Sequence, residues 1–105
     1  MVADVPGAVN EQLLSLVDSL KKKSGSYAIL LGAADDSKVS FVAAVSDDLI
    51  AKGLKAGDWI RDTAKATGGG GGGRPQLAQA GGKDPAKLPE ALEVARKFAQ
   101  KAVGG

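Results

Sequence analysis

The sequence GGGGGGRPQLAQAGGKDP, which runs from Gly68 to Pro85, is the most unusual stretch of this 105-residue chain. Six consecutive glycines are followed by Arg74, then by a short QLAQA segment, and then by a second glycine pair before Lys83. Glycine has no Cβ, so its backbone tolerates positive φ and can lie close against another surface. The run therefore predicts either a flexible linker or a backbone cradle whose N–H groups face an anion or a closely packed strand.

Two features of the run favour the cradle over the linker. Serine, the usual partner of glycine in flexible linkers, is absent from it, and the flanking sequence is patterned. Arg74 adds a planar guanidinium that suits phosphate. The run does not fit the P-loop or the dinucleotide-binding turn, because it lacks a GK[ST] ending and follows a helical pattern instead of a strand. If Gly70 and Gly71 need positive φ, alanine there would strain the backbone.

The spacing of apolar residues predicts the remaining elements of the chain. In order, they are a helix over 7–23, strands over 26–33 and 38–45, a short helix capped by Ser46 and reaching Gly53, a helix over 57–67, a short strand over 76–80 and a helix over 88–103. This order predicts an α/β fold: a small mixed β-sheet flanked by helices, with the glycine-rich loop between a helix and a strand.

The composition argues against catalysis and against a metal site. The chain has no histidine and no cysteine, so the usual general base and the thiolate ligands of zinc are both missing. The acidic pairs Asp35–Asp36 and Asp47–Asp48 are better interpreted as a turn and a helix start. We therefore expect no catalytic residue, no metal and no cofactor. No apolar run approaches the roughly 20 residues of a membrane span.

The charge balance is mild, with 14 Lys and Arg against 12 Asp and Glu, a net charge of +2 and a pI near 9.0. Basic residues near the glycine run either share one phosphate-contacting face or belong to a mixed-charge surface. The lysines at 21–23 either serve the helix dipole or contact phosphate. Trp59 either fills the core or stacks on an exposed base.

The segment GGGGGGRPQLAQAGGKDPAKLPEAL, residues 68–92, resembles the glycine-rich signature of the C-terminal globular domain family of alanyl-tRNA synthetase, the DHH-associated C-Ala domain. SDDLIAKGLKAGDWIRDTAKATGG, residues 46–69, resembles the family's approach to that signature. The resemblance covers about 24–103. Related phosphoesterases carry a histidine in a similar motif, where this chain has Arg74 and no DHH segment, so their activity is not implied.

The resemblance implies a non-catalytic module that holds tRNA(Ala) at its elbow while other domains of the synthetase aminoacylate and edit. It implies residues 1–23 as an N-terminal helix and 24–105 as the globular domain, in a cytoplasmic or organellar protein. The expected nucleic-acid-binding residues are Lys52, Lys55, Arg61, Lys65, Gly70, Gly71, Gly72, Gly73, Arg74 and Lys83. Two alternatives stay open: a module that forms a homodimer or binds another protein through the apolar stripe of the first helix, and a general DNA-binding domain.

Overall fold

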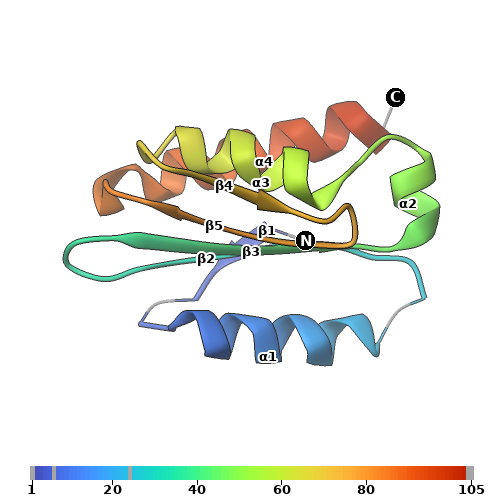
Figure 1. Cartoon of the computed structure of the whole chain (residues 1–105), viewed down its shortest axis with the longest axis horizontal. Coiled ribbons are helices and arrows are strands. Elements are labelled where there is room, and N and C mark those ends of the chain that lie inside the picture. Colours follow the sequence, from blue (N-terminus) through green and yellow to red (C-terminus); the bar gives the residue numbers. More distant parts are fainter. Residues whose placement is uncertain (1, 6, 24, 104–105) are drawn as a thin grey trace.

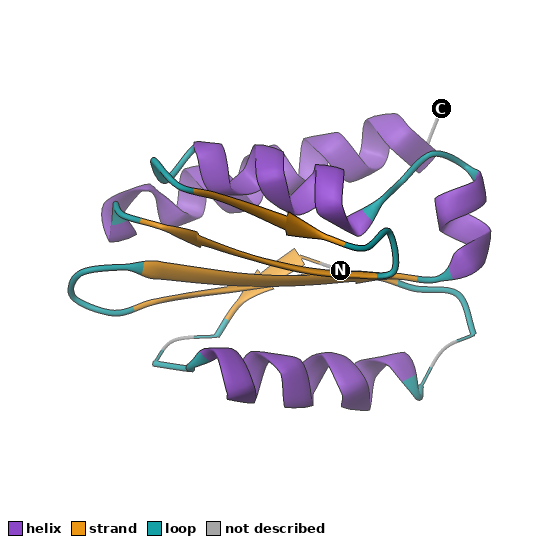
Figure 2. Ribbon diagram, in the orientation of Figure 1, coloured by secondary structure: helices purple, strands orange, loops and turns teal. Residues whose placement is uncertain are grey.

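The computed structural model describes residues 2–5, 7–23 and 25–103. The chain contains both helices and strands (Figure 2). They are β1 (Val2–Asp4), α1 (Asn10–Lys21), β2 (Ala28–Ala34), β3 (Val39–Val45), α2 (Asp47–Ala51), α3 (Ala56–Lys65), β4 (Gly70–Gly73), β5 (Leu77–Gly82), the 3-10 turn η1 (Pro85–Lys87) and α4 (Leu88–Val103).

The strands form one five-stranded sheet in the order β1-β2-β3-β5-β4. β1 runs parallel to β2, and the other neighbours are antiparallel, which confirms the predicted mixed sheet. Two strands were not predicted. β1 has three residues, too few to show a period of two. β4 lies inside the glycine run, where the sequence predicted a loop, because glycine carries no side-chain pattern that could mark a strand.

Helices cover both faces of the sheet, with α1 on one side and α3 and α4 on the other (Figure 1). On the α1 side, Leu13 and Val17 are buried against Ile29, Leu31 and Val42. The opposite side holds the larger cluster, in which the buried residues of α3 and α4 pack on β2, β3 and β5. The sheet is therefore the middle layer of three, and both of its faces are apolar.

Trp59 lies at the centre of the larger cluster and has no solvent-exposed surface. Its indole Nε1–H donates a hydrogen bond of 2.8 Å to the backbone carbonyl of Ala95 in α4. The core interpretation of Trp59 is confirmed. The alternative, that Trp59 stacks on a base, is wrong because the ring is enclosed by α3, α4 and the sheet.

The apolar stripe of α1 is largely used inside the molecule. Leu13 and Val17 are buried, and Leu20 packs against the same cluster. Among the described residues, the exposed large apolar side chains are Val9 at 59% and Leu16 at 40%. Ser24, where the two predicted parts of the chain would meet, lies outside the described residues, and the division stays a prediction.

The paired acids hold a turn and a helix start, as expected. Asp35 accepts hydrogen bonds from the backbone N–H groups of Ser37 and Lys38, and these bonds hold the pKa of its carboxyl below the ordinary value. Asp48, in the first turn of α2, accepts hydrogen bonds from the hydroxyls of Ser26 and Ser46, which lower its pKa. Within the described ranges, no helix is long and apolar enough to cross a membrane.

Candidate nucleic-acid interface

Strand β4 is made entirely of glycine and forms one edge of the sheet. Its inner side pairs with β5, with Gly70 opposite Gly81 and Gly73 opposite Ala78. The Arg74 N–H donates to the Leu77 carbonyl at 3.0 Å and closes the hairpin. Because hydrogen-bonded and non-hydrogen-bonded pairs alternate in an antiparallel ladder, the N–H and C=O of Gly71 point away from β5, toward the open edge.

The glycines of this strand are required at alternate positions by close packing. A Cβ on Gly71 would lie 2.5 Å from the Cα of Ala80, and a Cβ on Gly73 would lie 2.9 Å from the Cα of Ala78. A Cβ on Gly69, just before the strand, would lie 1.8 Å from the Gly81 carbonyl oxygen. Gly70 is different, because its Cβ would meet nothing within 4 Å. The backbone of this segment therefore packs too closely on β5 for a side chain at Gly69, Gly71 and Gly73.

The conformational reason suggested by the sequence does not apply to Gly70 and Gly71, since neither has positive φ. Gly68, with φ of 72°, is the residue that turns the chain from α3 into the strand. The sequence allowed a backbone cradle that faces either an anion or a closely packed strand. In the structure the glycine strand packs closely on β5. A flexible linker is excluded by the pairing of β4 with β5.

Helix α3 packs beside the glycine strand through its own glycine. A Cβ on Gly57 would lie 2.9 Å from the carbonyl oxygen of Gly73. Gly57 was not among the predicted site residues, because a single glycine near a helix start is an ordinary feature. At 100° per residue, Arg61 is turned about 40° from Gly57 and Lys65 about 80°. Both side chains therefore lie between the side of the helix that faces β4 and its solvent-exposed side, and both are exposed.

The predicted basic residues fall into two groups at opposite ends of β4. At the hairpin end, Lys55 is the N-cap residue of α3 and Arg74 follows β4. The two segments are joined by a hydrogen bond of 2.9 Å that the Ala56 N–H donates to the Pro75 carbonyl. At the other end, the Lys83 N–H donates 2.9 Å to the carbonyl of Thr67, two residues beyond Lys65.

Arg61 lies on α3 between these two groups, whereas Lys52 lies further back, at the end of α2. Gly70 to Gly73 form the strand that the two groups flank. The predicted residues are thus arranged around β4, with Lys52 at the margin.

The basic residues of this region differ in whether they form an ion pair. Arg61 lies 2.8 Å from Asp58, and Lys65 lies 3.9 Å from Asp62. For Arg74 and Lys83, both exposed, no carboxylate lies within 4.0 Å among the described residues. These two cations are therefore free to meet an anion without first leaving a partner. Arg74 directly follows the glycine strand, and Lys83 lies at its other end beside Thr67.

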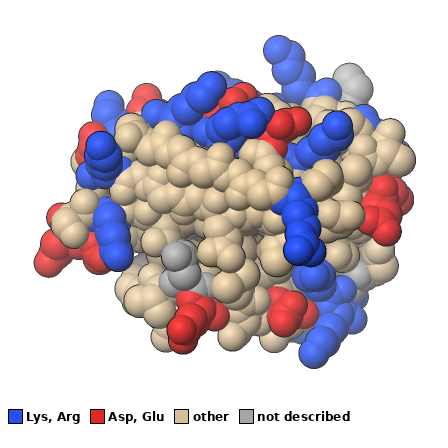
Figure 3. Space-filling view, in the orientation of Figure 1, with Lys and Arg blue, Asp and Glu red and all other residues tan. Residues whose placement is uncertain are grey.

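Figure 3 looks onto the side of the molecule where β4 lies and shows how charged and uncharged surface are distributed there. A broad band of uncharged surface crosses the middle of the molecule, and Lys and Arg side chains gather above it and at its two ends (Figure 3). A few acidic side chains stand among them, in keeping with the aspartates of α3. β4 itself contributes no side chain to this edge, because all four of its residues are glycine.

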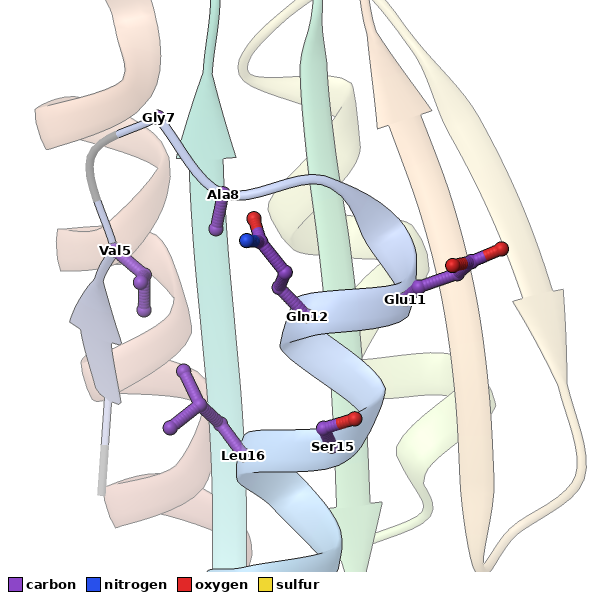
Figure 4. A pocket seen from close by; sticks show the side chains of 7 residues that line it. All are labelled: Val5, Gly7, Ala8, Glu11, Gln12, Ser15 and Leu16. Atoms are coloured by element: carbon purple, nitrogen blue, oxygen red, sulfur yellow. The ribbon is translucent and has the colours of Figure 1, made fainter.

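A hollow of the described chain lies elsewhere, beside α1. It has a volume of about 560 Å³ and is formed by α1 and the segment before it (Figure 4). It is lined by Val5, Gly7, Ala8, Glu11, Gln12, Ser15 and Leu16. In the described part of the chain, no three His, Cys, Asp or Glu residues come together in a group that could hold a metal ion.

Comparison with known proteins identifies the family. Residues 1–101 match the family model described as the DHHA1 domain. The chain belongs to the DHHA1 domain family. The match includes the first 23 residues, which the resemblance seen in the sequence did not cover.

Two curated relatives of this DHHA1 domain are alanine--tRNA ligases. The protein of Rhodopirellula baltica is 48% identical over 105 residues, and the match covers 99% of this chain and 11% of that protein. The protein of Trichodesmium erythraeum is 52% identical over 97 residues, covering 92% of this chain and 11% of that protein. The DHHA1 domain thus spans about a tenth of the length of these relatives.

Solved structures agree with this assignment. The C-Ala domain of Aquifex aeolicus alanyl-tRNA synthetase superposes with a TM-score of 0.79 at 33% identity, covering 97% of this DHHA1 domain and 87% of that chain. The resemblance to the C-Ala domain and the predicted fold class are both confirmed. A DHH-domain member of the S1p ribosomal protein family superposes with a TM-score of 0.62 at 20% identity, over 90% of this chain and 22% of that chain, which shows a shared fold alone.

Proposed function

We propose that this DHHA1 domain is a non-catalytic RNA-binding module of an alanine--tRNA ligase, and that it holds tRNA(Ala) at its elbow while other domains of the enzyme aminoacylate and edit. The observation that carries the proposal is the glycine edge of β4, flanked at each end by a cation that has no carboxylate partner within the described part of the chain. The partners are then the tRNA and the other domains of the ligase, in the cytoplasm or an organelle.

The geometry of the edge suits a nucleic-acid backbone. Four strand residues span about 14 Å, so Arg74 and Lys83 can contact phosphates several nucleotides apart. Between them, the strand offers the Gly71 N–H as a donor and carries no side chain that would hold the RNA away. A folded RNA corner is recognised by its shape and backbone, and a smooth surface between two cations matches that mode of recognition.

The chemistry of the chain supports a binding role. Catalysis by general acid and base uses histidine most often, and the chain has none. Asp35 and Asp48, the acids whose pKa is lowered, hold a turn and a helix start, and neither lies at the glycine edge. We infer that the module contributes affinity and position to the ligase, and that bond-making belongs to other domains.

The elbow is tested by comparing two RNAs. The domain is expected to bind tRNA(Ala) more tightly than a mini-helix that carries the acceptor stem but lacks the elbow. Affinity should fall as salt rises, because neutralised phosphates release counterions. Filter-binding titrations at three salt concentrations measure both effects. Equal affinity for the two RNAs would reject the elbow as the contact.

Arg74 and Arg61 are expected to differ in their contribution to tRNA binding. Arg74→Ala should weaken binding and lower the salt slope by about one contact. Arg61→Ala should have a smaller effect, since a phosphate has to compete with Asp58 for the Arg61 guanidinium. Both residues are exposed, so both variants should melt like the parent. The paired measurement is the salt slope of each variant beside its thermal melt; equal slopes would contradict the role of ion pairing.

Duplex DNA is the natural competitor in these titrations. Contacts to phosphate carry no sequence information, so a phosphate-binding edge also attracts DNA. The shape argument predicts that tRNA(Ala) displaces duplex DNA at equal nucleotide concentration. Displacement in the opposite direction would make the domain a general nucleic-acid-binding module.

Self-association is the second candidate function, and a different surface favours it. Val9, the residue before α1, and Leu16 on α1 are exposed, and Leu16 lines the hollow shown in Figure 4. A homodimer would cover such apolar surface. Sedimentation at micromolar concentration decides, with Leu16→Ser as the test variant. A parent that sediments as a monomer would reject it.

A further inference from the structure

A second group of basic residues lies at the same end of the sheet as Arg74, on the α1 side. Lys21 is the last residue of α1, Lys22 is its C-cap and Lys23 follows it. In Figure 3, blue side chains continue from the right-hand end of the uncharged band downward, over the C-terminal end of α1 that Figure 1 draws there. From the sequence, these lysines either serve the helix dipole or contact phosphate, and they are not among the predicted site residues.

Backbone pairing fixes the position of this group. Tyr27 lies just before β2, and its carbonyl accepts a hydrogen bond of 2.8 Å from the Ser46 N–H at the end of β3. The neighbouring Val45 N–H in turn donates 3.1 Å to the carbonyl of Gln76 in the β4–β5 turn. The start of β2, the end of β3 and the β4–β5 turn therefore share one end of the sheet. β2 and β4 are three strand spacings apart, about 14 Å.

The lysines are available to an outside anion. Lys22 and Lys23 are exposed, and no carboxylate lies within 4.0 Å of either among the described residues. The nearby Asp48 is engaged by the hydroxyls of Ser26 and Ser46. Lys21 is half-buried, with its Nζ 5.9 Å from the centre of the Tyr27 ring, which holds its side chain against the sheet end.

We propose that Lys21, Lys22, Lys23 and Arg74 form one basic tract, which carries the RNA backbone from the glycine edge across the end of the sheet onto the α1 side. This proposal rests on the function proposed above and extends the contact to a second face of the domain. The tract is wider than a Debye length of about 8 Å, so its ends act on different phosphates. The partner it fits is the phosphate backbone of a folded RNA.

The helix dipole offers a competing explanation for the lysines, and it makes a different prediction. Cations in the last turn stabilise a helix by a few tenths of a kcal/mol each, and the effect falls off beyond that turn. Lys23 lies past the C-cap, where little dipole benefit remains. If the dipole were the whole reason, removing the charges would lower the melting temperature and leave RNA binding unchanged.

The test uses the whole chain with Lys22→Ala and Lys23→Ala combined. The expected result is a roughly tenfold loss of affinity for tRNA(Ala) and a salt slope lower by about two contacts, with a melting temperature close to that of the parent. The matched control is Lys97→Ala with Lys101→Ala, which removes the same charge from the exposed side of α4. The control should bind within about twofold of the parent.

The outcomes separate this proposal from the one it rests on. If Arg74→Ala weakens binding and the lysine variant binds like its control, the tract is overturned while the glycine edge stands. If both lysine pairs weaken binding equally, the effect is one of net charge and the tract is overturned as well. If the parent does not prefer tRNA(Ala) to the mini-helix, the elbow itself is rejected.

Discussion

Gly71→Ala is expected to lower the free energy of unfolding by about 3 kcal/mol, although Gly71 is exposed to solvent. The new methyl group would lie 2.5 Å from the Ala80 Cα and 2.6 Å from both the Ala80 Cβ and the Gln79 carbonyl oxygen. Backbone has to move to admit it, and β4 cannot move freely because Gly73 is held against Gly57 of α3. In a domain of this size the change corresponds to a melting temperature lower by at least 10 °C or so.

Gly70→Ala is the matched control for this experiment, one residue away in the same strand. Its methyl group would meet nothing within 4 Å, and its φ is not positive. It is expected to melt like the parent or slightly higher, because alanine restricts the unfolded chain. The two variants remove the same glycine freedom, so a difference between them reports the packing. Equal melting temperatures would mean that β4 is not held against β5 as described.

The effect on RNA binding should follow the same order. Gly71→Ala displaces the strand whose outer edge is proposed to face the phosphate backbone, so it is expected to weaken tRNA binding even at temperatures where the domain stays folded. Gly70→Ala leaves the strand in place and adds one methyl group to the surface. Binding curves recorded beside the melts distinguish loss of the edge from loss of the fold.

Trp59→Ala is expected to have the other large effect, a loss of about 3–5 kcal/mol of stability. The side chain has no exposed surface and bridges α3 and α4 through its hydrogen bond to Ala95. Alanine would leave a cavity between two helices and the sheet, and few domains of this size have stability to spare. Chemical denaturation measures the loss, and the variant is expected to be mostly unfolded at 37 °C.

Two further variants bracket the Trp59 result. Trp59→Phe keeps most of the ring and loses the indole donor, so we expect a loss of only about 1–2 kcal/mol. Leu16→Ala truncates a side chain that is 40% exposed and should cost less than Trp59→Ala by several fold. A Trp59→Ala protein as stable as Leu16→Ala would contradict the core position of the ring.

Several elements could be predicted because their own residues carry the signal. The run SYAILLGA lacks the polar alternation of a one-sided strand, and β2 is covered on both faces. The spacing of Trp59, Ile60, Thr63 and Ala64 predicts one buried side of a helix, and all four are buried in α3. The predicted helix over 7–23 began too early, because residues 7–9 precede α1, which begins at Asn10. Local periodicity decides these matters, and it is weakest at element ends.

By itself, the sequence determined that the chain folds as a small α/β domain, that it resembles the C-Ala domain, and that the glycine run is its distinctive feature. Only the tertiary structure decided that the run is an edge strand and that its odd-numbered glycines are needed for contact with β5. It also decided that Arg61 and Lys65 are paired, whereas Arg74 and Lys83 have no ion-pair partner among the residues it describes. The physical reason is that a glycine run has no side chains to form a pattern. Its role depends on which backbone lies opposite, and that is decided by how β5 and α3 pack against it.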